Sequence, residues 1–207
     1  MKSIKIFLSL IFALSAAMGF SQNPDSANLP KKPINIKLCY NSTLIYGGAR
    51  AGAEFQVKAV SASRIRKSGR ESFYVKELLI GPTLSWYHHP GFHDNVYLTI
   101  CSIWRRTKST CFFTEFSPEI GYSRTFLGGT TYLVNGSGRV SVEKLAGYNY
   151  AFLSIGEGFG YDFSKSKSLP LMICLKINMM AMYPYNSTLY LRPAMEAGFI
   201  YKLRDEK

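Results

Sequence analysis

Alternation of apolar and polar residues with a period of two runs through most of the chain. Between Ile45 and Ala59 the odd positions are apolar or small, whereas the even positions include Arg50, Glu54 and Lys58. Successive side chains of a β-strand point to opposite faces, so this period indicates a strand whose faces meet different surroundings. Similar patterns predict seven further strands, near residues 32–40, 78–86, 96–105, 112–126, 153–163, 171–179 and 189–203.

The content of the two faces predicts how these strands are arranged. The apolar face carries more large side chains than the narrow lumen of an eight-stranded barrel can hold, whereas the polar face is rich in glycine, serine and charge. We therefore expect an all-β fold, an antiparallel up-and-down transmembrane β-barrel of about eight strands with its apolar face toward lipid. A soluble periplasmic barrel is the alternative. The dipeptide Asn135-Gly136 predicts a hairpin within a long loop at residues 130–142.

The amino terminus has the layout of a cleaved signal peptide. Lys2 and Lys5 precede an apolar run over residues 6–20, and Gly19-Phe20-Ser21 has the small-x-small pattern of a cleavage site. The run is shorter than the roughly twenty residues of a membrane-spanning helix. We expect a signal peptide at 1–21, a short polar segment at 22–31 and the barrel at 32–207.

The net positive charge bears on the partners that an exported protein can meet. Loss of Lys2 and Lys5 with the signal peptide lowers the formal charge from +12 to +10. An exported protein meets little nucleic acid, so we expect no nucleic-acid partner. Contact with outer-membrane lipid and with lipopolysaccharide phosphates is one interpretation of the positive charge. The other is that basic loops keep the protein soluble.

Charged residues on the polar face are balanced in sign. Buried charges are costly unless they are paired, so a cramped lumen requires such a balance. The predicted lumen network contains six bases and six acids: Arg50, Lys58, Arg105, Lys176, Arg192, Lys202, Glu54, Glu77, Glu115, Glu119, Asp162 and Glu196.

Three segments of the predicted strands resemble a known group of proteins. Ser117–Ser123, Arg192–Phe199 and Ala51–Phe55 are similar to strands of small outer-membrane β-barrel proteins from Bacteroidetes-type Gram-negative bacteria. The resemblance implies an eight-stranded, OmpX-like architecture and a location in the cell outer membrane. It implies no particular activity, because such barrels serve as adhesins, anchors, enzymes or subunits.

Candidate chemistry is sparse. His88, His89 and His93 fall in one loop with Asp94, and imidazoles with a carboxylate are ligands for a transition metal. The alternative is a polar loop at the membrane edge, because adjacent histidines at a strand end point in opposite directions. A lipid A-modifying enzyme needs a serine or threonine with a histidine base. The only histidines lie in this loop, so we expect neither catalysis nor a cofactor.

Two other features bear on export and on partners. Cys39, Cys101, Cys111 and Cys174 permit disulfides in an oxidising compartment, and a Cys101–Cys111 pair across a hairpin is the alternative to separate buried thiols, which we favour. Glu157 has the parity of the lipid-facing side, where a carboxylate is costly, so a partner protein is one explanation for it.

The expected function is therefore a non-enzymatic structural, anchoring or interaction component of the outer membrane, either alone or within a larger complex. The runner-up is a narrow passive pore or small-ligand binder. Counting back from a periplasmic carboxyl terminus places residues 128–147 and the histidine loop outside the cell, and it places the basic segment Ser61–Ser72 in the periplasm as a long loop.

Overall fold

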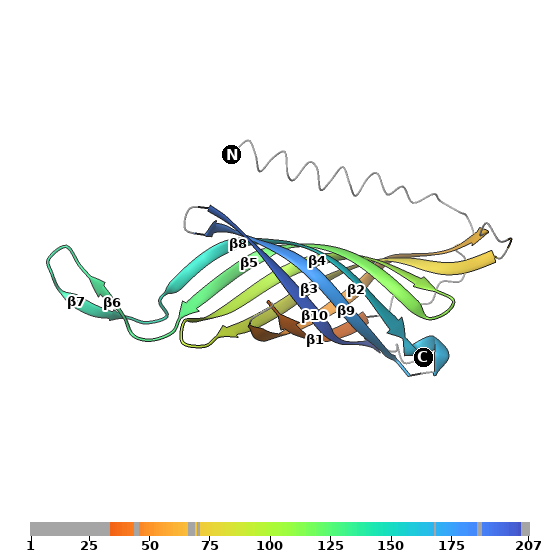
Figure 1. The fold of residues 1–207 in the computed structure, drawn as a ribbon, viewed down its shortest axis with the longest axis horizontal. Coiled ribbons are helices and arrows are strands. Elements are labelled where there is room, and N and C mark those ends of the chain that lie inside the picture. Colours follow the sequence, from red (N-terminus) through yellow and green to blue (C-terminus); the bar gives the residue numbers. More distant parts are fainter. Residues whose placement is uncertain are drawn as a thin grey trace.

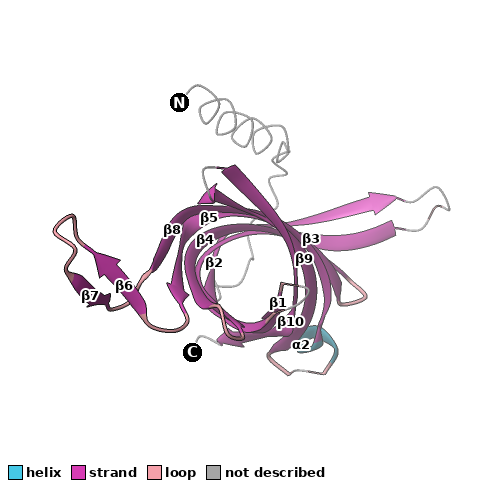
Figure 2. Ribbon diagram, turned by 60° about the vertical axis from the view of Figure 1, so that its left-hand side comes forward, coloured by secondary structure: helices cyan, strands magenta, loops and turns pink. Residues whose placement is uncertain are grey.

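The chain folds into one closed antiparallel barrel, seen from the side in Figure 1 and along its opening in Figure 2. The computed structural model describes residues 34–203 except 44–45, 66–68, 70, 168, 186–187 and the side chain of Lys165. The expected signal peptide at 1–21 and the polar segment at 22–31 lie outside the described residues. Eight strands form the barrel: β1 (Ile34–Ser42), β2 (Gly47–Ile65), β3 (Glu71–His89), β4 (His93–Lys108), β5 (Phe112–Leu127), β8 (Gly147–Asp162), β9 (Leu171–Tyr185) and β10 (Thr188–Leu203).

Each strand pairs with its neighbours in the chain, and β1 closes the ring on β10 through the register Ile34↔Leu203. This arrangement confirms the predicted all-β, up-and-down barrel of eight strands. Closure leaves no free sheet edge along the ring of paired residues. Within the described residues, no helix has the length and apolar character needed to cross a membrane.

Two small elements lie outside the barrel wall. The predicted hairpin is present as β6 (Thr131–Val134) and β7 (Val140–Glu143), which extend away from the barrel in the long connection between β5 and β8 (Figure 1). One helical turn, α2 (Phe163–Ser166), follows β8, and no helix was expected from the sequence there. It forms because the Asp162 carboxylate accepts a hydrogen bond from the Ser164 backbone N–H at 3.0 Å and so caps the turn.

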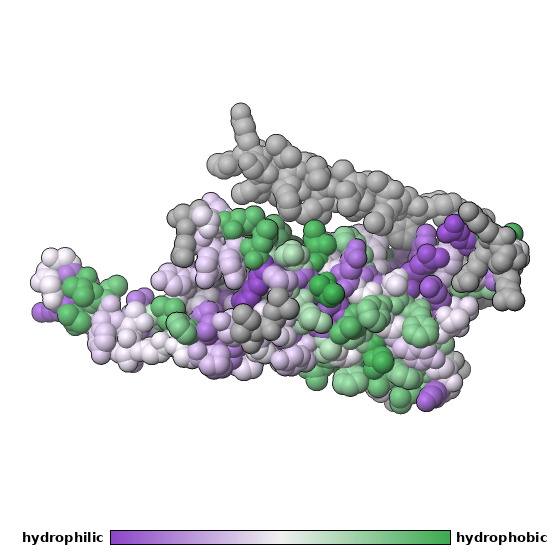
Figure 3. Space-filling view, viewed as in Figure 1, coloured by the Kyte–Doolittle hydropathy of each residue, from purple (hydrophilic) through white to green (hydrophobic). Residues whose placement is uncertain are grey.

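The outer face is apolar, as the alternation predicts. Leu38, Ile100 and Ile177, on three different strands, are each 60% exposed on that face. The residues before and after each of them in its strand point inward. Apolar side chains spread around the whole wall in this way form a belt, and part of it is green in Figure 3.

A bulge in β2 reverses the predicted orientation of one charged residue. The register between β2 and β3 shifts between Gln56 and Lys58, so two residues of β2 occupy the space of one opposite β3. Beyond the shift, Ala59 is buried in the lumen and Lys58 is exposed on the outer face. The prediction that Lys58 belongs to the lumen network is wrong for this reason.

The segment that we expected to be a long basic loop is mostly strand. β2 continues to Ile65 and β3 begins at Glu71, and the two remain paired to these ends. β1 covers β2 only as far as Phe55, so this hairpin projects beyond the rest of the barrel (Figures 1 and 2). It projects at the end of the barrel that carries Leu203. Its position in the periplasm stays a prediction.

Candidate functional site

Charged side chains from six strands meet in the middle of the lumen. Four bases and four acids are each at most 4% exposed, and every one of them has an oppositely charged partner: Lys37, Arg50, Arg105, Lys176, Glu54, Glu115, Glu119 and Glu196. We call these eight residues the ion layer. Its formal charge is zero, which fits the requirement that buried charges be paired.

One part of the ion layer is centred on Arg105. Its guanidinium Nη2 lies 2.9 Å from carboxylate oxygens of both Glu54 and Glu115. The Glu54 carboxylate also accepts a hydrogen bond from the Asn35 side-chain amide at 3.1 Å. A planar guanidinium offers five N–H donors, so one arginine holds two carboxylates in fixed positions.

The other part is centred on Arg50 and Lys176. Arg50 bridges Glu119, at 2.5 Å, and Glu196. The Lys176 ammonium lies 3.4 Å from Glu119 and 3.9 Å from Glu196, and it donates to the Ser117 hydroxyl at 2.8 Å. Lys37 completes this part at 3.3 Å from Glu196. Four of these charges, Arg50, Lys176, Glu119 and Glu196, each have at least two polar partners, which offsets the cost of removing them from water.

The remaining two strands, β3 and β8, contribute no charge to the ion layer. β3 contributes a hydroxyl group, and β8 contributes glycines that leave room for side chains of other strands. Thr83 of β3 accepts a hydrogen bond from Arg50 at 2.7 Å. On β8, the lumen positions opposite Asn178 and Phe113 are the glycines Gly156 and Gly160. A Cβ on Gly156 would lie 2.0 Å from the Asn178 amide oxygen, and one on Gly160 would lie 2.3 Å from the Phe113 ring. The glycine series of β8 thus leaves the room that long side chains from the other strands occupy.

Apolar layers close the lumen on both sides of the ion layer. The inward residues of β9 are in order Met172 and Cys174, then Lys176 and Asn178, then Met180 and Met182. Met172 and Cys174 pack in one buried cluster with Cys39, Phe113 and Ile200, toward the end that carries Leu203. The opposite cluster contains the two other methionines with Tyr87, Tyr97, Tyr150, Phe152 and Ala194. The Tyr97 and Phe152 rings stack at 4.9 Å between centroids.

Four predicted members of the lumen network lie apart from the ion layer. Lys202 and Asp162 form their own pair at 2.6 Å near the end of the barrel, where Lys202 is 27% exposed. Arg192 donates to the Tyr87 hydroxyl at 2.7 Å and stacks over the Tyr87 ring at 4.4 Å. Glu77 faces the lumen side beside Arg105 in the register but is only half-buried.

Sequence reasoning missed Lys37, which is the fourth base of the ion layer and makes its formal charge zero. It lies on β1, where the alternation around it was weak, and its burial at 3% became visible only in the closed ring. Its even neighbours Ile36 and Leu38 face outward, so correct placement of the strand ends would have revealed it.

The histidines predicted as metal ligands divide between two faces. His88 is exposed on the outer side, where its Nδ1 lies 2.9 Å from the Asp94 carboxylate. His89 stacks on Tyr46 at 3.8 Å between centroids and lies 5.1 Å from the His93 ring. Within the part of the chain that the structure describes, no three histidine, cysteine or acidic side chains gather as a metal-binding group.

All four cysteines are separate buried thiols, as we favoured. Cys101 and Cys111 are not joined. Cys39 and Cys174 lie closest, with 4.0 Å between their sulfurs, but Gly198 of β10 separates them in the register. Two inter-strand spacings amount to about 9–10 Å, more than the Cα separation that a disulfide tolerates.

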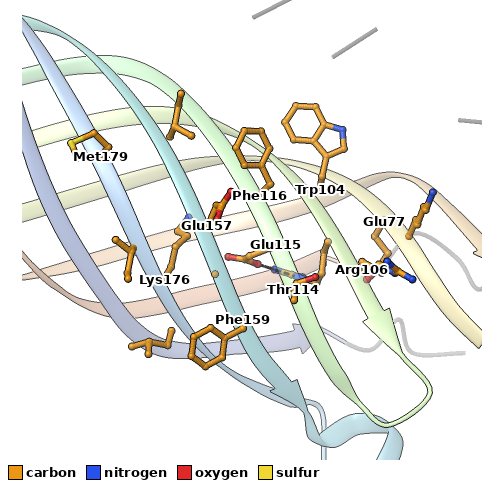
Figure 4. Close-up of a pocket in the computed structure, with 16 residues that line it drawn as sticks. Glu77, Trp104, Arg106, Thr114, Glu115, Phe116, Glu157, Phe159, Lys176 and Met179 are labelled. Carbon is orange, nitrogen blue, oxygen red and sulfur yellow. Dashed lines mark hydrogen bonds and ion pairs between the residues drawn. The ribbon is translucent and has the colours of Figure 1, made fainter. Parts of the chain in front are cut away.

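A groove of about 880 Å³ lies in the barrel wall across β3, β4, β5, β8 and β9. Its lining combines outward residues, such as Trp104 and Phe116, with the inward residues Arg105, Glu115 and Lys176. Glu157 lies in it on the outward side, next to Phe116 and close to Trp104, while Arg106 lies at one end (Figure 4). The structure therefore places Glu157 as predicted, among outward apolar residues.

Comparisons with known proteins find similarity of fold. No protein-family model matches the sequence, and no curated protein matches it. The solved structure of Neisserial surface protein A (NspA) is 12% identical over 83% of this chain and 96% of that one, with a TM-score of 0.49. The outer membrane enzyme PagL is 10% identical over 83% and 99% of the two chains, with a TM-score of 0.39. The beta domain of the Bordetella autotransporter Brka is 12% identical over 81% and 66%, with a TM-score of 0.37.

Removal of one member of the ion layer should be costly. Arg105→Leu leaves Glu54 and Glu115 buried without their cation, so we expect the free energy of unfolding to fall by about 3–5 kcal/mol. Urea titration of the folded protein in detergent, followed by tryptophan fluorescence, measures the change. The control is Asp94→Asn in the exposed pair with His88, whose side chains are 45% and 49% exposed, where about 1 kcal/mol or less is expected. Equal losses in the two variants would contradict the assignment of Arg105 to a buried network.

Proposed function

We propose that this protein is a sealed, non-conducting β-barrel of the outer membrane that acts through its outer surface, as a structural, anchoring or interaction component of the cell envelope. The observation that carries the proposal is the filled lumen. Eight charges of zero net sum lie between two apolar clusters, and each of them is at most 4% exposed. An ion or solute would have to break several buried ion pairs to pass.

A location in the outer membrane is supported by the apolar belt as a whole rather than by any single residue. Leu38, Leu84, Ile120, Ile177 and Phe199 are each more than half exposed, and they come from five different strands. A closed barrel satisfies its backbone hydrogen bonds between strands, which is the condition for crossing hydrocarbon with strands. Tyr40, Tyr122, Tyr183 and Tyr201 on the outer face suit the interfaces of a bilayer. A Bacteroidetes-type source stays a prediction from the three sequence segments.

The filled lumen weighs against the narrow pore and the internal ligand site. The alternative of a lipid A-modifying enzyme lacks support from the histidines, since no serine or threonine of the described residues hydrogen-bonds to the His88–Asp94 pair, and His89 stacks on Tyr46. We therefore propose a protein without catalytic residues and without a cofactor. Deletion of its gene should leave the mass spectrum of lipid A unchanged.

Planar-bilayer recording tests the sealed lumen. We expect the purified full-length barrel to insert without stable conductance steps, because the ion layer and both apolar clusters fill the path. A general-diffusion porin in the same chamber serves as the positive control. Reproducible steps from the wild-type protein at moderate voltage would overturn the proposal in favour of the pore.

A protein contact on the outer wall is the second part of the proposal. Glu157 is an outward carboxylate in mid-strand, with Phe116 and Ile177 opposite it on the neighbouring strands. Charge on the lipid side of a barrel is destabilising, so a basic or hydrogen-bonding side chain of a partner would stabilise this position. The partner that fits is an apolar membrane-embedded segment with one such side chain.

Purification of the tagged protein in mild detergent, with particle mass as the readout, tests this contact. We expect a particle larger than the barrel alone, and we expect Glu157→Leu to release the barrel as a monomer that is still folded. Glu143→Gln in the exposed β6–β7 hairpin is the control and should leave the particle intact. A wild-type monomer, or an assembly unaffected by Glu157→Leu, would contradict a contact at Glu157.

A further inference from the structure

The outward face of β2, β3 and β4 is strongly basic at the end of the barrel that carries Leu203. Its bases surround Tyr74, and we call this group the basic face: Arg64, Lys76, Arg106 and Lys108. Lys58 lies on the same side because of the bulge in β2. Figure 3 shows hydrophilic residues gathered near the end where β2 and β3 project, beside the green part of the belt.

The register brings these bases together. Tyr74 pairs with Lys108, and Lys76 pairs with Arg106. These two neighbouring cross-strand pairs of β3 and β4 place three cations around the Tyr74 ring. The Arg106 guanidinium lies over the Tyr74 ring at 3.9 Å from its centroid, and the Lys76 ammonium lies at 5.9 Å. Stacking on the ring fixes Arg106 in place with its N–H donors available at the edges.

At this end of the barrel, the described outward positions of β2, β3 and β4 carry no acid, and the outward acid Glu157 lies on β8, farther along the groove that Lys76 and Arg106 line. Glu71 and Glu77, the two acids of this part of β3, alternate with Ser72, Tyr74 and Lys76 and so have the parity of the inner side. The outward charge of these three strands at this end is therefore of one sign. Such a face favours an anion from outside the chain.

The basic face adjoins the belt directly. The next outward residues along β3 and β4 are Leu78 and Trp104, and the groove begins there. Lys76 and Arg106 line one end of the groove, and Trp104, Phe116 and Met179 line its apolar part (Figure 4). A ligand that suits both regions has an anionic head and an apolar tail.

We infer that the basic face binds the phosphate-bearing headgroup of an anionic phospholipid, in the leaflet at the end of the barrel that carries Leu203. The Arg106 guanidinium and the Lys76 ammonium donate to phosphate oxygens, and the acyl chains lie along Trp104 and Phe116. Bases beside a hydrocarbon surface are known to attract anionic lipids, and their long stems reach from the apolar region to the headgroups. This binding goes beyond the proposed function and depends neither on the sealed lumen nor on a partner at Glu157.

Two tryptophans allow the test to be made within one molecule. Trp104 lies beside the basic face, whereas Trp86 lies toward the other end of the barrel, where it donates to Asp94. The full chain with Trp86→Phe reports lipid at Trp104, and the full chain with Trp104→Phe reports lipid at Trp86. The barrel is reconstituted in phosphatidylcholine vesicles that contain dibrominated phosphatidylglycerol or dibrominated phosphatidylcholine, and quenching of fluorescence is compared.

We expect phosphatidylglycerol to be favoured about threefold or more at Trp104 and not at Trp86. The preference at Trp104 should disappear in Arg106→Gln combined with Lys76→Gln and persist in Arg106→Lys, which keeps the charge. Arg124→Gln is the matched control, because Arg124 also stacks on a ring, that of Phe126 at 5.3 Å, at the opposite end of β5. Heat-dependent gel mobility verifies that each variant is folded.

Three results would overturn the inference. They are equal quenching by the two lipids at Trp104, an equal preference at both tryptophans, and a preference that survives loss of Arg106 and Lys76. A face that ignores phosphatidylglycerol but binds an acidic peptide in an Arg106-dependent way would instead be a protein-binding surface.

Discussion

Every charge in the ion layer must find an opposite charge, and much of the structure follows from this requirement. A barrel of eight strands is too narrow to hold bulk water beside its inward side chains. Arg50, Arg105 and Lys176 therefore depend on carboxylates from other strands, and the pairs that result join strands far apart in the sequence. The Arg50–Glu196 contact links β2 to β10 across the closure, and Lys176–Glu119 links β9 to β5. The same contacts that satisfy the charges thus fix the cross-section of the barrel.

The filling of the lumen explains why function is assigned to the outer surface. Long side chains from six strands occupy the middle, and β8 contributes glycines where these side chains need room. Apolar clusters lie on the two sides of the ion layer, and this filling is the basis for our proposal that the described part of the lumen conducts no solute. What varies on the outer wall is charge: an acid at Glu157 within the belt and bases around Tyr74 at its border. These two places distinguish this barrel from a uniform membrane plug.

Much of the fold could be predicted from the period of two, whereas the contents of the site could be predicted only in part. The faces of β4, β5, β8, β9 and β10 follow from parity, and so the lumen positions of Arg105, Glu115 and Lys176 were correct. A bulge reverses the parity of the residues that follow it, and no residue type in β2 predicts its position. Lys58 was assigned to the wrong face for that reason. Parity predicts the face on which a residue lies but not its position along the barrel axis. Arg192 and Lys202 face inward as expected, yet each lies too near one end to join the ion layer.

Reactivity of the native thiols tests the sealed lumen most directly. Cys39, Cys101 and Cys174 are at most 6% exposed and lie in the inner clusters, so a small, charged, thiol-specific reagent should not modify them in the folded barrel. Site-resolved mass spectrometry after long exposure measures this, with Ser109→Cys at the exposed β4–β5 turn as the positive control. The account predicts modification at residue 109, and none at Cys39, Cys101 or Cys174, until the protein is unfolded. Rapid labelling of Cys101 or Cys174 in the folded protein would show that water and solutes enter the lumen, and it would contradict the sealed barrel.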